Sequence, residues 1–306
     1  MIRFVARRLL EAVPVLFIVV TITFFMVRIA PGGPFDSERD VNPTILANLR
    51  AHYNLDAPVL VQYTDYLKGL LKGDLGPSFS DPGFTVNERI AQGFPVSLEL
   101  GFYALIVALV LGLTTGIIAA VRPNSGWDYS SMSLAMAGIC IPNFVLGPLL
   151  VLVFGLWLEW LPVTGWDTPG AKILPSLTLG FAYAAYIARL TRGGMLEVLA
   201  QDFIRTARAK GLSEARVVLR HGLRGGLQPV ISFLGPAAAG LLSGSFVVEM
   251  IFQVPGLGRF FVQGAFNRDY TLITGTVLFY AGLIVVLNLA VDVALAWLDP
   301  RLRAES

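Results

Sequence analysis

Six stretches of this sequence are long and apolar enough to cross a membrane as helices. A hydrocarbon core about 30 Å thick needs roughly 20 apolar residues in a helix. The composition agrees, because 55% of the 306 residues are hydrophobic and only 14% are charged, against roughly 25% charged in an average soluble domain. The sequence therefore predicts an all-α integral membrane protein with six transmembrane helices. We expect these helices at about residues 9–30, 96–121, 131–158, 173–191, 230–252 and 273–298.

The first apolar stretch resembles a signal peptide, because it follows Arg3, Arg7 and Arg8. A signal peptide that is removed ends in a cleavage site of the small-x-small type. Residues 28–33 offer no such site, and five further apolar stretches follow. We therefore expect the first stretch to remain in the protein as an uncleaved signal anchor.

The distribution of Lys and Arg predicts the orientation of the helices. An even number of spans places both termini on one side, and cytoplasmic loops carry the excess of Lys and Arg. The termini, the loop near Arg122 and the segment 192–229 together hold thirteen of these residues. The two short loops on the other side hold three, namely Lys172, Arg259 and Arg268. The loop 31–95 is left out of the comparison, because a loop of this length crosses regardless of its charge. Both termini and the segment 192–229 are therefore expected in the cytoplasm.

This orientation leaves the loop 31–95 as the one extracytoplasmic part with room for structure of its own. It holds two helix-like pieces, Thr44–Tyr53 and Val61–Leu71, and a run of turn-forming residues at 73–77. We expect it to form a small cap. The predicted regions are the N-terminal segment with the first transmembrane helix (1–30), the cap region (31–95), a five-helix core that includes the segment 192–229 (96–298), and a cytoplasmic tail (299–306).

Two short amphipathic helices, separated at Gly211, are predicted in the basic segment from Met195 to Pro229. Glycine suits the left-handed residue that ends a helix, and Ser213 suits the N-cap of the next helix. Apolar residues three or four positions apart share one face of a helix. The first face holds Leu196, Leu199, Ala200, Phe203 and Ala207, and the second holds Ala215, Val218, Leu219, Gly222 and Leu223, with Arg216, Arg220 and Arg224 opposite. Such a surface is suited to contact with another molecule.

Pairs of glycines four residues apart lie within two of the apolar stretches. They are Gly112 with Gly116 and Gly240 with Gly244. Small residues at this spacing let helix backbones approach closely. We therefore expect a tightly packed helix bundle.

Glu249 and Asp292 are acidic residues within the apolar stretches. A carboxylate at membrane depth is costly and usually faces a cavity or a partner, so both are candidates for lining a translocation path. A structural role stays open, in which Glu249 pairs with an arginine such as Arg189 or lies at the membrane interface. Glu11 and Arg28, at span ends, can reach water by snorkelling. Two isolated acids are too few for a proton relay.

Motifs for catalysis and for nucleotide binding are missing from the sequence. It contains no G-x-x-x-x-G-K-[ST], no H-E-x-x-H and no G-x-S-x-G, the motifs of P-loops, zinc proteases and serine hydrolases. The single cysteine, Cys140, excludes an intramolecular disulfide, and His52 and His221 lack the spacing of metal ligands. We expect a protein that is not an enzyme and that holds no metal or cofactor of its own.

The residues alone leave three classes of function open. The chain could be a channel or secondary carrier that works by itself. It could be a membrane scaffold whose segment 192–229 lies on anionic lipid, as basic amphipathic helices do. It could also be the membrane half of a pump whose nucleotide-driven motor is a separate protein.

Residues 204–211 and 227–229 resemble the cytoplasmic "EAA" loop of importer permeases from the ATP-binding cassette superfamily. That loop has Glu-Ala-Ala, a glycine after three more residues and a proline further on. Ala207, Gly211 and Pro229 match it, whereas Arg205 and Thr206 replace the Glu and the first Ala. This departure is usual in the peptide-importing branch of the family.

Other segments of the chain carry the same resemblance, in order and over nearly its whole length. The Gly-Gly-Pro-Phe and Gly-Pro-Ser-Phe segments resemble the first permease subunit of oligopeptide importers more than those of dipeptide, nickel or other importers. The matching segments are Arg7-Arg8, Pro31-Gly32-Gly33-Pro34-Phe35, Gly73-Asp74-Leu75-Gly76-Pro77-Ser78-Phe79, Phe94-Pro95-Val96-Ser97, Gly244-Ser245-Phe246-Val247-Val248-Glu249, Pro255-Gly256-Leu257-Gly258, Asn267-Arg268-Asp269-Tyr270 and Asp299-Pro300-Arg301.

The resemblance implies a permease subunit in the bacterial cytoplasmic (inner) membrane. Its implied partners are a second, related permease, two ATPase subunits that hold ATP and Mg, and an extracytoplasmic peptide-binding protein; no nucleic acid is implied. The translocation path would lie between the two permeases. The residues implied to dock on the ATPase are Arg205, Thr206, Ala207, Arg208, Ala209, Lys210, Gly211 and Pro229.

Overall fold

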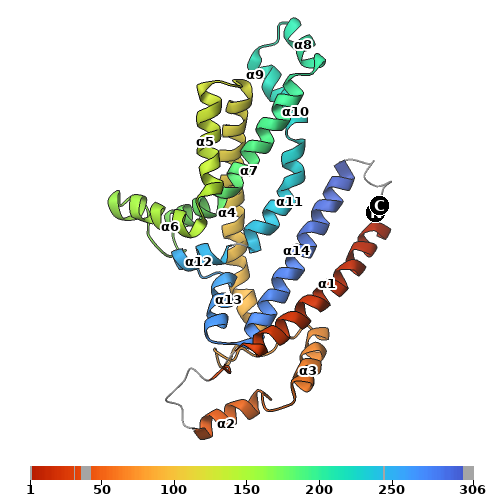
Figure 1. The fold of residues 1–306 in the computed structure, drawn as a ribbon, viewed down its shortest axis with the longest axis vertical. Helices are drawn as coiled ribbons and strands as arrows, with labels where there is room; N and C mark the ends of the chain where they lie inside the picture. Colours follow the sequence, from red (N-terminus) through yellow and green to blue (C-terminus); the bar gives the residue numbers. More distant parts are fainter. Residues whose placement is uncertain (1, 31, 36–42, 244, 299–306) are drawn as a thin grey trace. The chain divides into compact units, whose positions relative to one another are not determined.

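The computed structural model describes residues 2–30, 32–35, 43–243 and 245–298 (Figure 1). These residues form helices joined by turns and irregular segments. Among them, the β-type pairing is limited to an isolated bridge between Pro77 and Thr85. The all-α prediction is therefore confirmed for the described part. The chain divides into two compact units, Met1–Ser97 with Pro255–Leu289 (unit 1) and Leu98–Val254 with Ala290–Ser306 (unit 2). The predicted tail at 299–306 lies outside the described residues.

Four helices among the described residues are individually long and apolar enough to span a membrane. Two further spans result if each of two bent helix pairs is counted as one. The predicted stretches at 96–121, 173–191 and 273–298 each fall within one of the four, and the stretch at 9–30 extends one residue beyond its helix. These helices are α1 (Ile2–Ile29), α4 (Val86–Val121), α7 (Ile173–Leu199) and α14 (Tyr270–Leu298).

The predicted single helix at 131–158 is wrong, because the chain bends there by 110°. Helix α5 (Gly126–Cys140) ends at Ile141, whose backbone is extended at φ −93° and ψ 113°. The next residue is Pro142, and a proline disfavours the helical conformation of the residue before it. The chain then continues as α6 (Asn143–Leu150) and the π-helix η1 (Val151–Trp157).

The predicted single helix at 230–252 is also wrong. Helix α11 (Gln228–Ser243) ends before the short helix α12 (Phe246–Phe252) begins. The segment Glu214–Gly226 precedes α11 and meets it at a 56° bend. Gly240 lies at a close approach, since a Cβ there would be 2.2 Å from the hydroxyl of Tyr183. Gly244, the second glycine of that predicted pair, lies outside the described residues.

Unit 1 contains the two helices predicted within the loop 31–95. They are α2 (Pro43–His52) and α3 (Val59–Leu71), and this unit also contains α13 (Leu257–Phe266). One apolar cluster joins the start of α4 to α13 and α14 through Val86, Ile90, Leu257 and Leu272. A second cluster gathers aromatic side chains from distant segments, namely Phe35, Phe79 and Tyr270 with Tyr53 against them.

A fully buried carboxylate, that of Asp269, holds the loop after α3 in unit 1. It accepts six hydrogen bonds, and we call this group of residues the Asp269 clasp. Because a charged acceptor strengthens each hydrogen bond and buried polar groups need partners, the clasp fixes the path of the loop. Oδ2 accepts from Ser78 Oγ (2.6 Å), Phe79 N (2.8 Å), Ser80 N (2.9 Å) and Ser80 Oγ (2.9 Å), and Oδ1 accepts from Leu272 N and Thr271 Oγ1 (both 3.0 Å).

A second contact in unit 1 joins α4 to the start of α13. Ser97 Oγ accepts a hydrogen bond of 2.8 Å from the backbone N–H of Leu257. One helical turn earlier, Gly93 lies against the same backbone, where a Cβ would be 2.8 Å from Leu257 N. The missing side chain at Gly93 therefore allows this approach.

Helix α7 is packed closely by its neighbours in unit 2. A Cβ at Gly112 of α4 would lie 2.7 Å from the carbonyl oxygen of Ala184, and one at Gly116 would lie 2.6 Å from that of Ala188. The predicted close approach at this glycine pair is confirmed. Helix α5 is joined to α7 by an ion pair, in which both guanidinium contacts of Arg192 with the buried carboxylate of Asp128 are 2.7 Å.

Candidate functional site

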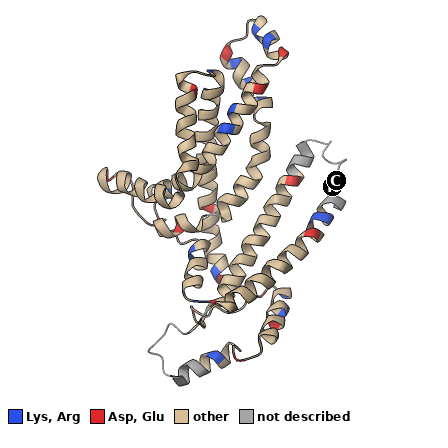
Figure 2. Ribbon diagram, viewed as in Figure 1, with Lys and Arg blue, Asp and Glu red and all other residues tan. Residues whose placement is uncertain are grey.

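The segment predicted to dock on another molecule lies between α7 and α11. Helix α8 (Asp202–Ala209) is followed by the short helix α9 (Glu214–Arg216), the π-helix η3 (Val217–Gly222) and α10 (Leu223–Gly226). In Figure 2, Lys and Arg gather on α8 and the segment after it, whereas α4, α5 and α11 show few charged residues. The basic residues of this unit therefore concentrate on the candidate segment.

The predicted continuous helix from Leu196 to Ala207 is wrong. Leu196 and Leu199 belong to the last turn of α7, and the chain leaves the helix at Ala200 and Gln201. Gln201 is extended, with φ −76° and ψ 155°, and α8 then starts with Asp202 in its first turn. An acidic residue at this place is favourable, because the N-terminal end of a helix carries partial positive charge.

Helix α8 has a buried apolar face and an exposed polar face. Ile204 and Ala207 are buried against Val217, with Leu199 and Leu212 packed around them. Ala207, which the sequence placed in a docking motif, thus faces inward and holds α8 to the protein. The exposed residues of the predicted docking set on α8 and its C-cap are Arg205, Thr206, Arg208, Ala209 and Lys210.

Gly211 ends α8 in the left-handed conformation, with φ +77°, as predicted. Its N–H donates to the carbonyl oxygen of Arg208 at 2.9 Å. A Cβ at Gly211 would meet nothing within 4 Å, so the backbone conformation and not the space requires glycine here. Ser213 takes the predicted N-cap position of α9, although its side chain forms no capping hydrogen bond.

An ion pair closes the turn around Gly211. Arg208 Nε donates to Glu214 Oε1 at 2.8 Å, and a second guanidinium nitrogen donates to Oε2 at 3.2 Å. The hydrogen bond to this carboxylate raises the pKa of Arg208. Arg205 contacts Asp202 at 3.3 Å, where both side chains are mostly exposed. Both pairs face solvent, so they are exchangeable for contacts with another protein.

Pro229, predicted to belong to the docking set, lies beside α8 across a hollow of 400 Å³. Pro229 is the second residue of α11, a position in the first turn where proline costs no helical hydrogen bond. The exposed ring of Phe203 lines the same hollow. The hollow is lined by Gly194, Glu197, Val198, Gln201, Phe203, Gly225, Gln228, Pro229 and Ser232.

Behind this hollow, α7 and α10 touch through glycines. A Cβ at Gly194 would lie 2.3 Å from the carbonyl oxygen of Gly226, and one at Gly226 would lie 2.7 Å from the sulfur of Met195. Packed protein is stiff and has few discrete arrangements. The close contact between α7 and α10 is therefore a stiff junction.

The two residues predicted to line a translocation path, Glu249 and Asp292, lie on different helices and differ in their surroundings. Glu249 of α12 is fully buried and accepts a 2.6 Å hydrogen bond from Ser245 Oγ. The side chain of Glu249 is therefore enclosed by the protein in the conformation described. Arg189 contacts the sulfur of Met136 and lies over the ring of Tyr186. Asp292 is half-buried on α14.

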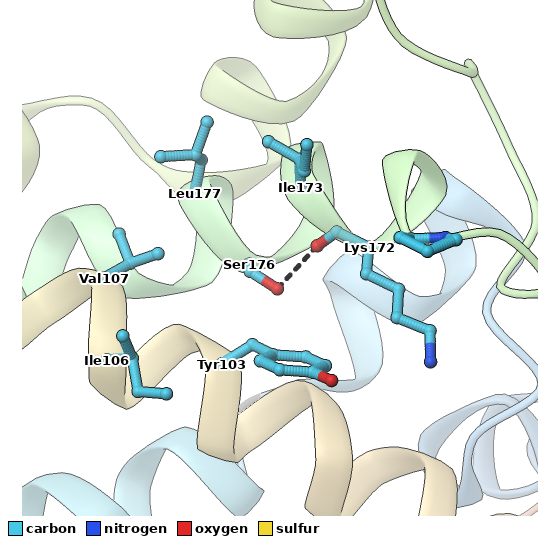
Figure 3. A pocket seen from close by; sticks show the side chains of 8 residues that line it. Tyr103, Ile106, Val107, Lys172, Ile173, Ser176 and Leu177 are labelled. Carbon is cyan, nitrogen blue, oxygen red and sulfur yellow. Dashed lines mark hydrogen bonds between the residues drawn. The ribbon is translucent and has the colours of Figure 1, made fainter.

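A cavity of 370 Å³ between α4 and α7 was not anticipated from the sequence. Figure 3 shows Tyr103, Ile106 and Val107 of α4 facing Ser176 and Leu177 of α7 across it. At its end Lys172 Nζ contacts Glu99 Oε1 at 2.6 Å, and the indole N–H of Trp166 donates to Glu99 Oε2 at 2.9 Å. Glu99 is an acid within the predicted span 96–121, and that signal could have identified this polar group. In the described part of the chain, no cluster of three or more His, Cys, Asp or Glu is arranged to hold a metal ion.

Two family profiles match this sequence over most of its length. Residues 1–101 match the N-terminal region of membrane components of binding-protein-dependent transport systems. Residues 112–304 match the family described as "Binding-protein-dependent transport system inner membrane component".

Individual relatives match over the full chain. The oligopeptide transport system permease proteins OppB of Salmonella typhimurium and Escherichia coli K12 are each 50% identical over 305 residues, covering 99% of this chain and 100% of theirs. The dipeptide transport system permease protein DppB of Bacillus subtilis is 44% identical over 303 residues, covering 99% of this chain and 98% of its own.

Solved structures share the fold at low sequence identity. The inward-facing MetNI methionine ABC transporter has a TM-score of 0.57 at 18% identity, covering 71% of this chain and 96% of that chain. An amino acid ABC transporter has a TM-score of 0.52, also at 18% identity, covering 68% of this chain and 92% of that chain.

Proposed function

The chain belongs to the family of binding-protein-dependent transport system inner membrane components, and we propose that it is a permease subunit of an ATP-driven oligopeptide importer. The observation that carries this proposal is the 50% identity to oligopeptide permease proteins over 99% of the chain. The protein works in the bacterial cytoplasmic (inner) membrane. Its task is transport and not catalysis, since ATP and Mg are held by separate ATPase subunits.

The proposed assembly contains a second, related permease, two ATPase subunits and an extracytoplasmic peptide-binding protein. Six spans cross the membrane when each bent helix pair counts as one. The excess of Lys and Arg puts both termini and α8 in the cytoplasm and the loop 31–95 outside. The outer loops then receive the binding protein, and the peptide crosses between the two permeases.

Helix α8 is proposed as the coupling element. Its exposed face, carrying Arg205, Arg208 and Lys210, docks on the ATPase, while its buried face around Ile204 holds it to the permease. ATP binding moves the ATPase subunits, and the motion passes from α8 to the segment that it packs against at Val217, and from α10 to α7 through their glycine contact. This is rigid-body coupling between two global states.

Glu249 and Asp292 remain the proposed contributors to the path. The short bond between Glu249 and Ser245 favours a structural role for Glu249 in the conformation described. Glu249→Gln keeps the shape and removes the charge, so a changed preference among transported peptides supports contact with substrate. A change confined to the yield of protein assigns Glu249 to structure.

The test of the assembly is purification of the tagged chain in mild detergent, followed by identification of the proteins that accompany it. We expect a second permease and an ATPase. A self-associated chain without an ATPase contradicts the proposal and restores the channel or secondary-carrier class.

Dipeptides are the second candidate substrate, because a dipeptide permease protein is 44% identical over 99% of this chain. Competition for uptake of a labelled pentapeptide separates the two. Unlabelled pentapeptide should compete strongly and dipeptide weakly, and the reverse result assigns the protein to dipeptide import.

A further inference from the structure

A cavity of 220 Å³ lies within unit 1, between the end of α1, the helix α3 and the loop after it. Its walls combine apolar and hydrogen-bonding groups. Pockets that enclose whole drug-sized ligands have roughly 300–1,000 Å³, so this cavity suits one end of a longer molecule. The lining residues that carry the argument are Arg28, Gln62, Tyr66 and Asp74.

Arg28 is the cation of this cavity and is half-buried, and two carboxylates also line the cavity: Asp65, which pairs with Lys68 at 3.0 Å, and Asp74. Its guanidinium donates to Gln62 Oε1 at 3.2 and 3.3 Å and to the carbonyl oxygen of Phe24 at 3.1 Å. Its central carbon lies 3.4 Å from the centroid of the Phe24 ring. The sequence suggested that Arg28 snorkels to water, but the side chain instead folds back against its own helix. All of these partners are neutral.

Arg89 gives the contrast within the same unit. Its guanidinium also lies over an aromatic ring, that of Phe84, at 3.8 Å, but it pairs with the carboxylate of Asp81 at 2.9 Å. Among the residues that the structure describes, Arg28 has no such carboxylate. A partly desolvated cation without a counter-charge is unfavourable unless an anion joins it.

The groups around Arg28 are arranged to keep this position open for an anion. Gln62 Nε2 donates to the carbonyl oxygens of Leu55 (3.0 Å) and Ala57 (2.9 Å), which turns Oε1 toward Arg28. The hydroxyl of Tyr66 is buried and has no hydrogen-bond partner among the described residues. Burial raises the pKa of Tyr66, so the hydroxyl stays protonated and can donate.

The same cavity also offers an acceptor for N–H groups. Asp74 lines the cavity, and its Oδ1 accepts the backbone N–H of Gly76 at 2.9 Å. The second oxygen of a carboxylate can accept further N–H groups. A ligand with an anionic end and amide N–H groups next to it therefore matches both Arg28 and Asp74.

We propose that this cavity binds the C-terminal residue of a peptide, with the α-carboxylate on Arg28 and a backbone amide directed to Asp74. The proposal rests on the function proposed above and gives the permease its own contact with the substrate class. The carboxylate would satisfy the guanidinium through charge-assisted hydrogen bonds.

The test uses the complete transporter in lipid nanodiscs, without nucleotide and without the binding protein. Binding of trialanine and of trialaninamide is compared by saturation-transfer NMR titration. Since a hydrogen bond to a charged group contributes about 1.5–3 kcal/mol, amidation should weaken binding at least about tenfold. Arg28→Met should weaken trialanine binding to the same extent and abolish the difference between the two peptides. Arg89→Met, the matched variant, should leave that difference unchanged, and thermal melting checks that each variant is folded.

Equal binding of the two peptides to the unmodified transporter overturns the proposal without any variant. Equal effects of Arg28→Met and Arg89→Met also overturn it. Capture of the binding protein is measured in parallel: if Arg28→Met weakens capture and leaves trialanine binding unchanged, Arg28 receives an acidic side chain of that partner and the proposal is wrong. ATP-dependent uptake by the unmodified transporter is a separate readout, so this inference can fail while the function in peptide import holds.

Discussion

The Asp269 clasp and the turn around Gly211 are two polar arrangements that each fix the path of a loop, and they differ in burial. Asp269 is fully buried and accepts six hydrogen bonds. Arg208 and Glu214 share two hydrogen bonds, with side chains that are 42% and 63% exposed. A buried polar group that loses its partner is costly, whereas an exposed ion pair is replaced by water at little cost. Burial therefore makes the clasp part of the fold, and exposure leaves the turn available for a partner.

The largest expected effect is that of Asp269→Ala. It leaves the N–H groups of Phe79 and Ser80 without their acceptor in a buried site, so the free energy of unfolding should fall by about 1–3 kcal/mol for each unsatisfied N–H group. Thermal melting in detergent measures this loss. Asp202→Ala, which removes a carboxylate that is 94% exposed, is the control and should lower the stability by no more than about 1 kcal/mol. If the melting temperatures of both variants were similar, burial would not explain the difference in stability between the Asp269 clasp and the turn around Gly211.

Adjacent glycines of α7 give the next comparison. Gly194→Ala places a methyl group 2.3 Å from the carbonyl oxygen of Gly226, and overpacking of this kind costs about 1–3 kcal/mol. Gly193→Ala meets nothing within 4 Å and should stabilise the helix by about 0.5–1 kcal/mol. Melting temperatures should thus move in opposite directions, and peptide uptake should fall with Gly194→Ala alone. A loss of uptake in both variants would contradict the role of the α7–α10 contact in transmitting motion.

Gly211→Val should act mainly on coupling. Its left-handed conformation costs a β-branched residue about 1–2 kcal/mol, which the chain relieves by shifting the end of α8. ATP hydrolysis stimulated by the binding protein should lose its link to peptide uptake, while the protein still inserts in the membrane. Gly211→Asn is the matched variant, because asparagine tolerates this conformation, and it should retain most of the uptake. Unchanged hydrolysis and uptake in the valine variant would refute the coupling role of α8.

The smallest effect on stability is expected from Glu214→Gln. An exposed ion pair contributes about 0.2–1 kcal/mol, so the melting temperature should hardly change. The variant releases Arg208 from its intramolecular partner. The affinity for the ATPase should therefore change, and it should depend more strongly on salt concentration. The double variant with Arg208→Gln completes a mutant cycle. A fall in melting temperature as large as that of Asp269→Ala would contradict the claim that the exposed ion pair contributes less to stability than the buried clasp.

Local chemistry explains which parts of this structure were predictable. Gly211 and Ser213 occupy the expected positions, because a helix end is determined by a few neighbouring residues. The break at Ile141 was also readable from Pro142, although the apolar run around it concealed the signal. The end of α7 at Leu199 was not readable, since the apolar spacing continues through the break and only packing against Val217 and Leu212 selects the exposed face of α8.

Contacts between distant segments account for most of what the sequence did not reveal. Ser78 and Asp269 are 191 residues apart, and Ser97 and Leu257 are 160 apart. Each of these residues lies in a segment that resembles the permease family, yet periodicity gives no means of pairing one segment with another. In the structure the segment of Ser78 contacts that of Asp269, and the segment of Ser97 contacts that of Leu257. Part of the sequence resemblance therefore reflects packing within unit 1 and not contact with substrate.

The separation of Ser78 from Asp269 also has a consequence in time. A ribosome adds roughly 5–20 residues per second, so the 191 residues between the two partners take roughly 10–40 s to synthesise. Throughout that interval the loop after α3 has left the ribosome without the carboxylate that will hold it. The loop after α3, although made early, is therefore among the last parts of unit 1 to reach its native contacts, and it stays accessible to proteases until the chain is nearly complete.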